Sequence, residues 1–171
     1  MRILVRPAEQ RDAATAIDVA RRSIQQLCIA DHRGDRETLA AWLVNKTPDN
    51  FIAWLANPDN FCVVAELDDR LSGVGLLHRS GEIRLFFLAP GTQRKGVGKT
   101  IHAELETAAK RWGMDSLHLD STAMARPFYE ALGYRSTGAA IPRFGVLQCF
   151  PYEKPLMREG PIEPDAFRGS T

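Results

Sequence analysis

Residues 60–113 constrain the fold more than any other part of the chain, because they join three strand patterns to a strong helix through a short cationic loop. Residues 60–90 predict three strands, separated by turns at 68–72 and 79–82. The loop 93–100 reads Gln-Arg-Lys-Gly-Val-Gly-Lys-Thr and leads into a helix over 96–113, where apolar residues recur at helical spacing. Glycines let the backbone approach a ligand closely, and an exposed helix start offers unpaired N–H groups. This loop therefore predicts an anion-binding site.

The other patterns alternate between strand and helix and show no internal repeat. Strands are expected over 2–8, 116–122, 134–138 and 145–155, helices over 9–28, 36–43, 48–57 and 124–133, and a loop over 29–35. We therefore expect an α/β fold with a mixed sheet, forming a single domain over residues 1–157. The segment 158–171 is rich in Pro and Gly and is expected to be a flexible tail.

Composition excludes several classes of function. A net charge of +1 over 171 residues gives no reason to expect a nucleic acid or an anionic membrane as partner. No apolar stretch approaches transmembrane length. The three cysteines are widely spaced without a CxxC pair, which indicates reduced thiols and a cytoplasmic protein. The four histidines are scattered along the chain, so we expect no metal site.

Two nucleotide-binding motifs compete for the loop, and each lacks a required glycine. A P-loop needs glycine at position 93, where the chain has Gln93. A dinucleotide-binding fingerprint needs glycine at position 101, where the chain has Ile101. That fingerprint also belongs in a parallel βαβ unit, whereas hairpin-like strands come first here. The sequence disfavours both motifs.

The segment LAPGTQRKGVGKTIHAELETAAKRWG resembles the acetyl-coenzyme A motif of the GNAT superfamily of N-acyltransferases. Gln93, Gly96 and Gly98 occupy the motif positions, and Pro90 stands three residues before Gln93. LHLDSTAMARPFYEALGYR looks like the family's second signature, a strand and a helix containing Phe-Tyr-Glu-x-x-Gly-Tyr. Arg94 departs from the pattern, since many members carry a second glycine there. The resemblance covers roughly residues 61–135 and implies a twisted, mostly antiparallel sheet flanked by helices, with splayed central strands.

The resemblance implies acetyl-coenzyme A as the co-substrate, with no metal. In this family the backbone amides of the loop bind the diphosphate at the helix N-terminus, and Lys95 and Lys99 would add charge. Leu88 lies where the family offers backbone hydrogen bonds to the pantetheine arm. Ser121 ends the fifth strand, where a hydroxyl or amide often meets the cofactor. The implied cofactor-binding residues are Leu88, Gln93, Arg94, Lys95, Gly96, Val97, Gly98, Lys99 and Ser121.

Attack of an amine on a thioester needs a route for the amine proton and an acid for the departing sulfur. The family's Phe-Tyr pair places its tyrosine beside the cofactor sulfur, which makes Tyr129 the expected acid. A phenol has a pKa near 10 and stays protonated at neutral pH. The alternative for Tyr129 is a core aromatic whose hydroxyl is satisfied by the protein.

Glu82 is the expected base. In the histone-acetylating branch of the family a glutamate eleven residues before the motif's first position acts as base, and Glu82 has that offset from Gln93. Regular strand alternation would place Glu82 on one face together with Arg84, Phe86 and Leu88. The alternative for Glu82 is an exposed glutamate beside a turn with no catalytic role. In that case water or a group of the substrate would take the amine proton.

The sequence therefore predicts an N-acetyltransferase that moves an acetyl group from acetyl-coenzyme A to a primary amine by direct attack. The alternatives are a noncatalytic regulatory module that binds acetyl-coenzyme A and a P-loop nucleotide-binding enzyme. Small-molecule amines and peptide or protein amines all stay open as acceptors, and a homodimer stays open as the assembly. In this family the loop after the first helix shapes the acceptor pocket. In this chain that loop contains Asp31, His32, Asp35 and Arg36.

Overall fold

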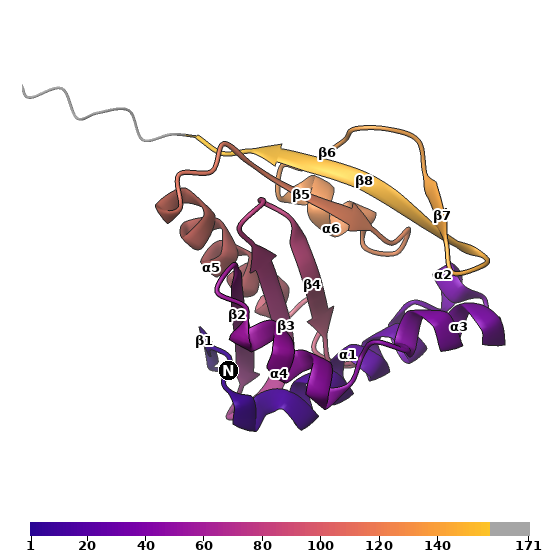
Figure 1. The fold of residues 1–171 in the computed structure, drawn as a ribbon, viewed down its shortest axis with the longest axis horizontal. Helices are drawn as coiled ribbons and strands as arrows, with labels where there is room; N and C mark the ends of the chain where they lie inside the picture. The colour runs from indigo at the N-terminus through magenta and orange to yellow at the C-terminus, as the bar shows by residue number, and fades with distance from the viewer. Residues whose placement is uncertain (158–171) are drawn as a thin grey trace, which may run out of the picture.

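The computed structural model describes residues 1–157, which form two sheets (Figure 1). The first sheet is antiparallel, in the order β1-β2-β3-β4, with bounds Ile3–Pro7, Asn60–Leu67, Arg70–His78 and Ile83–Leu88. The second has the order β5-β8-β6, with bounds Ser116–Ser121, Leu147–Pro155 and Arg135–Ser136, and β7 (Ile141–Arg143) also pairs with β8. The flexible tail expected for 158–171 lies outside the described residues.

Helices cover both faces of the first sheet. Their bounds are α1 Ala13–Leu27, α2 Ile29–His32, α3 Arg36–Leu43, α4 Pro48–Ala56, α5 Val97–Arg111 and α6 Arg126–Ala131. In Figure 1 the helices α1, α3 and α4 run along the lower side of the molecule, while β5 to β8 lie across the top. The expected loop 29–35 contains the short helix α2, and β7 was not expected.

Among residues 1–157 the buried core forms three clusters, two of which lie on opposite sides of the first sheet. On one side Val63 and Ala65 of β2 pack in the same cluster as Ile101 and Leu105 of α5. On the other side Val64 packs with α1 and α4. β2 is therefore buried on both faces, which explains its run of five apolar residues at 61–65.

The two sheets meet where β4 and β5 begin and then separate. A parallel bridge joins Glu82 to His118, and the His118 N–H donates to the Gly81 carbonyl at 3.0 Å. Beyond this point β5 pairs with β8, and β4 pairs with β3. The structure thus confirms the expected mixed α/β fold with splayed central strands.

A β-bulge in β4 makes the expected side-chain alternation wrong. The pairing of β4 with β3 skips Arg84. Because one extra residue reverses the order of the faces, Ile83 packs in the same core cluster as Phe86 and Leu88. The common face expected for Glu82, Arg84, Phe86 and Leu88 therefore does not exist.

Gly75 of β3 lets α5 pack closely against the sheet. A Cβ built on Gly75 would lie 2.6 Å from Ile101 Cγ2 and 3.2 Å from Leu105 Cδ1, and both side chains are fully buried. Gly75→Ala should therefore lower the free energy of unfolding by about 1–3 kcal/mol, the usual effect of overpacking. Gly138→Ala is the control, because its added Cβ would have its nearest neighbour at 3.7 Å. Equal urea midpoints for the two variants would contradict this packing.

Candidate functional site

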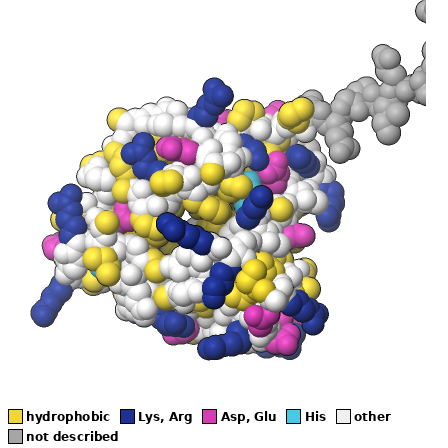
Figure 2. Space-filling view, turned by 180° about the vertical axis from the view of Figure 1, so that it is seen from behind, with side chains coloured by type: hydrophobic (Ala, Val, Ile, Leu, Met, Phe, Trp, Pro, Cys, Tyr) yellow, Lys and Arg dark blue, Asp and Glu magenta, His cyan; other side chains and the backbone are white. Residues whose placement is uncertain are grey.

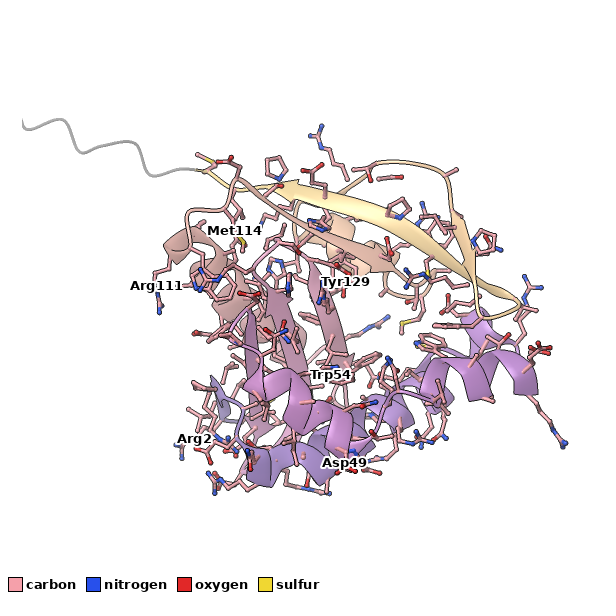
Figure 3. All side chains as sticks on the ribbon, in the orientation of Figure 1. Arg2, Asp49, Trp54, Arg111, Met114 and Tyr129 are labelled. Atoms are coloured by element: carbon pink, nitrogen blue, oxygen red, sulfur yellow. The ribbon has the colours of Figure 1, made fainter. Side chains whose placement is uncertain are left out.

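A cavity of about 280 Å³ lies where β4 and β5 separate. Its wall includes three of the residues expected at the site, namely Glu82 at the start of β4, Ser121 at the end of β5 and Tyr129 on α6. Figure 3 shows Tyr129 between the two sheets. Residues far apart in the sequence therefore meet around one space, as a catalytic site requires.

Tyr129 is held in an aromatic cluster. Its ring lies 5.1 Å from Phe128, 5.5 Å from Tyr134 and 5.9 Å from Phe86, measured between centroids. Within residues 1–157 no side-chain hydrogen bond holds its hydroxyl, although the residue is only 6% exposed and lines the cavity. Burial, and secondarily the thiol of Cys28, raises the Tyr129 pKa above its usual value. The hydroxyl is therefore protonated at neutral pH and can donate to a group in the cavity.

Glu82 lies at the junction of the sheets with a cationic neighbour. Its Oε2 is 3.4 Å from Arg84 Nε, and both side chains are partly exposed. The carboxyl group of Glu82 therefore has a cationic neighbour at the edge of the cavity.

Ser121 is fully buried, and its hydroxyl donates to the Thr122 carbonyl at 2.7 Å. The serine lines the cavity, but this hydroxyl proton is already used within the protein.

The loop before α5 forms a tight turn with two residues at positive φ. Gly96 has φ +87° and Arg94 has φ +61°, both in the left-handed region. A glycine would adopt the conformation of Arg94 without strain. The Gly91 N–H donates to Gln93 Oε1 at 2.9 Å, so the Gln93 side chain shapes the turn.

The start of α5 leaves donors free. The first hydrogen bond at this end runs from the Thr100 N–H to the Gly96 carbonyl at 3.0 Å, so the N–H groups of residues 97–99 have no partner within the helix. Arg94, Lys95 and Lys99 are exposed, and none makes an ion pair within residues 1–157. This helix start can therefore hold an anion.

Packing explains two loop residues that the sequence assigned to ligand binding. A Cβ on Gly98 would lie 3.1 Å from Phe128 Cζ and 3.4 Å from Leu88 Cδ1. Val97 is fully buried in the core. Only the backbone of these residues is available to a ligand. A bulky side chain at Gly98 would therefore disturb the contact between α5 and α6 whether or not a ligand binds.

Leu88 directs its backbone groups into the gap between the sheets. The Ala89 N–H donates to the Ser72 carbonyl across β3 at 2.8 Å. Antiparallel ladders alternate, so the N–H and C=O of Leu88, which pairs with Gly73, point away from β3. That side is open, because β5 has diverged. Leu88 and the loop 93–99 do not line the cavity itself.

Lys46 lines the cavity and was missed by the sequence analysis. It is only 8% exposed, and its Nζ donates to Asn45 Oδ1 at 2.7 Å. Burial lowers the Lys46 pKa from 10.5 to about 8. Arg21 Nη1 donates to the carbonyls of Leu43 and Lys46 and so fixes this loop between α3 and α4. A lysine in a short polar loop ordinarily indicates a solvated surface residue, so the sequence held no signal for its burial.

The loop after α1 has a structural role that differs from the expected one. Asp31 Oδ1 accepts a hydrogen bond from the Ala123 N–H at 2.7 Å, which ties α2 to the segment after β5. Asp35 caps α3 through the Thr38 N–H at 3.0 Å. Asp31, His32, Asp35 and Arg36 do not line the cavity.

Within the described part of the chain, no group of three His, Cys, Asp or Glu side chains could hold a metal ion. No helix among residues 1–157 is long and apolar enough to cross a membrane. The three cysteines are free and buried.

The splayed sheets, the enclosed tyrosine and the free helix start suit the acyl transfer that the sequence predicts. The family model described as "Acetyltransferase (GNAT) domain" matches residues 22–156. The chain belongs to the GNAT acetyltransferase family.

Solved structures of this fold extend over most of the chain. A GCN5-related N-acetyltransferase from Rhodopseudomonas palustris is 24% identical with a TM-score of 0.80, covering 91% of this chain and 97% of that one. PaiA N-acetyltransferase from Thermoplasma acidophilum, solved with coenzyme A, is 23% identical with a TM-score of 0.76, covering 91% and 100%. YncA from Salmonella typhimurium, solved with acetyl-CoA, is 17% identical with a TM-score of 0.71, covering 97% and 99%. The comparison with curated proteins gave no match.

Lys46→Met should stabilise the protein by about 3 kcal/mol at pH 7, because it removes a buried charge whose pKa falls from 10.5 to about 8 on folding. Below pH 8 the lysine is charged in both the folded and the unfolded chain, so the whole burial penalty is present. Between pH 8 and 10.5 the folded chain loses the proton first, and the penalty disappears. The gain over the parent protein should therefore shrink across this range in urea titrations.

Lys110→Met is the control, because Lys110 is exposed near the end of α5. Its effect should stay within about 0.5 kcal/mol at every pH. If Lys46→Met raises the free energy of unfolding equally at pH 7 and pH 10.5, the gain comes from packing rather than from the removed charge.

Proposed function

We propose that this protein transfers an acetyl group from acetyl-coenzyme A to a primary amine by direct attack, and that residues 1–157 form the catalytic domain. The observation that carries the proposal is Tyr129, a buried residue that lines a cavity at the opening between β4 and β5 and whose hydroxyl makes no side-chain hydrogen bond within residues 1–157. A buried, protonated phenol beside such an opening suits a group that protonates a departing thiolate.

The chain offers coenzyme A two kinds of contact. The free N–H groups at the start of α5, with Arg94, Lys95 and Lys99 around them, suit a diphosphate. The outward backbone groups of Leu88 suit the amide groups of the pantetheine arm, which would add to β4 as an extended strand. Ser121 at the end of β5 would help to shape the gap between β4 and β5 in which the cofactor lies. The solved relatives that contain coenzyme A or acetyl-CoA support this assignment.

In the proposed reaction Glu82 takes a proton from the acceptor ammonium, directly or through water. The neutral amine then attacks the thioester carbonyl carbon, and the Leu88 N–H stabilises the negative charge that develops on the carbonyl oxygen. Collapse breaks the carbon–sulfur bond, and the Tyr129 hydroxyl protonates the thiolate. The second proton leaves the attacking nitrogen and returns through water to the Tyr129 oxygen, and Glu82 releases the first proton to solvent. The products are the N-acetylated amine and coenzyme A.

The acceptor is a separate question, because one fold serves many substrates. Structures of this fold include the ribosomal-protein-S18-alanine N-acetyltransferase from Escherichia coli and aminoglycoside 6'-acetyltransferase type Ii. We propose an amine on a small molecule, a peptide or a protein, in the cytoplasmic setting that the cysteine pattern indicates.

Acetyl-coenzyme A should raise the melting temperature of the parent protein, since a ligand bound by the folded state stabilises it. The double variant Lys95→Met/Lys99→Met should weaken coenzyme A binding roughly threefold to tenfold, the size expected for two exposed charge contacts, and most strongly at low salt. Lys110→Met at the other end of α5 should leave the dissociation constant unchanged. If millimolar acetyl-coenzyme A does not raise the melting temperature of the parent protein, the proposal is wrong.

Tyr129→Phe should lower kcat and kcat/KM together, by roughly ten- to a thousandfold, while coenzyme A binding hardly changes. The loss should be smaller with an acetyl thioester whose leaving thiol is more acidic, because that thiolate needs less help from an acid. Stopped-flow thiol release with both donors measures this contrast.

Tyr134→Phe is the matched control, because the Tyr134 hydroxyl is bonded to His102 Nε2 at 2.8 Å and does not line the cavity. It should lower stability by about 1 kcal/mol and affect both donors equally. If Tyr129→Phe also affects both donors equally, Tyr129 is not the acid.

A further inference from the structure

We propose that the acceptor is an amine that carries a carboxylate, an amino-acid-like molecule, and that Lys46 and Arg84 hold this carboxylate in the cavity. The inference rests on the proposed acetyl transfer for its chemistry. Its support comes from the charges that line the cavity.

Lys46 is a buried cation without a counterion. No carboxylate lies within 4 Å of its Nζ among residues 1–157, and its side-chain hydrogen bond goes to the neutral Asn45 Oδ1. Buried charges are normally paired, and an unpaired ammonium destabilises the fold. Because Lys46 lines the cavity, an anionic ligand there would supply the missing partner.

Arg84 adds a second cation to the lining of the cavity. The β-bulge releases this residue from the alternation of β4, and its side chain lines the main cavity as well as an adjoining one of about 180 Å³. Glu82 contacts its Nε edge at 3.4 Å, which leaves the Nη groups available. A guanidinium presents these groups in the geometry that a carboxylate accepts.

The carboxylate belongs in the larger cavity. The adjoining cavity is lined by Asn60, whose buried Oδ1 has no partner. A free carbonyl oxygen suits a donor such as water and repels an anion. Lys46 and Arg84 line both cavities, so they can face a carboxylate on the side of Glu82 and Tyr129.

The charges that line the cavity favour an acceptor that carries one carboxylate. Arg84 pairs with Glu82 at 3.4 Å and Arg143 pairs with Asp120 at 3.8 Å. These four side chains and Lys46 all line the cavity, and Lys46 leaves it with one positive charge. One carboxylate neutralises that charge, whereas a polycationic acceptor would meet repulsion.

The relative positions of the charges also fit an α-amino acid. Glu82 and Arg84 are neighbours, so an ammonium at Glu82 and a carboxylate at Arg84 and Lys46 can belong to one small molecule. Met124 and Phe144 line the same cavity and are 45% and 42% exposed, which gives its mouth an apolar edge. An apolar side chain of the acceptor can pack there.

The test uses the full-length protein with saturating acetyl-coenzyme A and follows thiol release. Matched acceptors are L-phenylalanine and L-methionine, their C-terminal amides and their decarboxylated amines, with spermidine as a polycation. The acids should exceed the analogues without a carboxylate in kcat/KM by roughly ten- to a hundredfold, the usual worth of a charged hydrogen bond. A melting shift for each acceptor in the presence of coenzyme A measures binding without turnover.

Lys46→Met should remove most of this preference, chiefly through KM, while Lys46→Arg should retain most of it. Lys110→Met is the control and should behave like the parent protein. The thermal shift with acetyl-coenzyme A should be the same in all variants, which also checks that each one folds.

Preferred turnover of the amides or of spermidine would overturn the inference and leave acetyl transfer intact. So would the absence of both thiol release and a thermal shift with every carboxylated amine, provided that acetyl-coenzyme A still binds. A protein that fails to bind acetyl-coenzyme A refutes the proposed function instead.

Discussion

The bridge between Glu82 and His118 controls the geometry on which the rest of the site depends. It joins the two sheets at one end, and beyond it each strand satisfies its backbone with partners on its own side. The two strands can therefore separate without leaving backbone N–H and C=O groups unpaired in the core, because the unpaired edge of β4 faces an opening. The short helix α6 follows β5 and places Tyr129 at that opening (Figure 3).

The elements that the sequence predicted best are those with a clear period or a capping signal. The expected helix over 36–43 matches α3, and Asp35 supplies its cap. The sheet pairing explains what was missed. The bulge at Arg84 depends on how β3 and β4 align, and β7 exists because β8 offers its edge. Neither leaves a periodic trace in its own residues. Family resemblance gave Tyr129 and Glu82 their expected roles, and the structure brings both to one cavity while their roles stay predictions.

The glycine-containing loop shows how one motif can combine two physical requirements. Gly96 has a left-handed backbone that a glycine adopts without strain. Gly98 provides space for Phe128 instead. The cations around them are exposed, and Figure 2 shows that Lys and Arg side chains are spread over the face that it views, with a hollow near the middle. A sequence motif reports that glycine is required at a position but not which neighbour requires it.

The bulge in β4 frees the residue at position 84 from the pairing of the sheet. Strand residues on either side of Arg84 remain in register with β3 and bury their side chains in the two core clusters of the first sheet. The bulged residue contributes no ladder pair, so its identity is free to change with the ligand while the surrounding sheet keeps its register. A library that randomises position 84 should therefore lose fewer folded clones than one that randomises its neighbours.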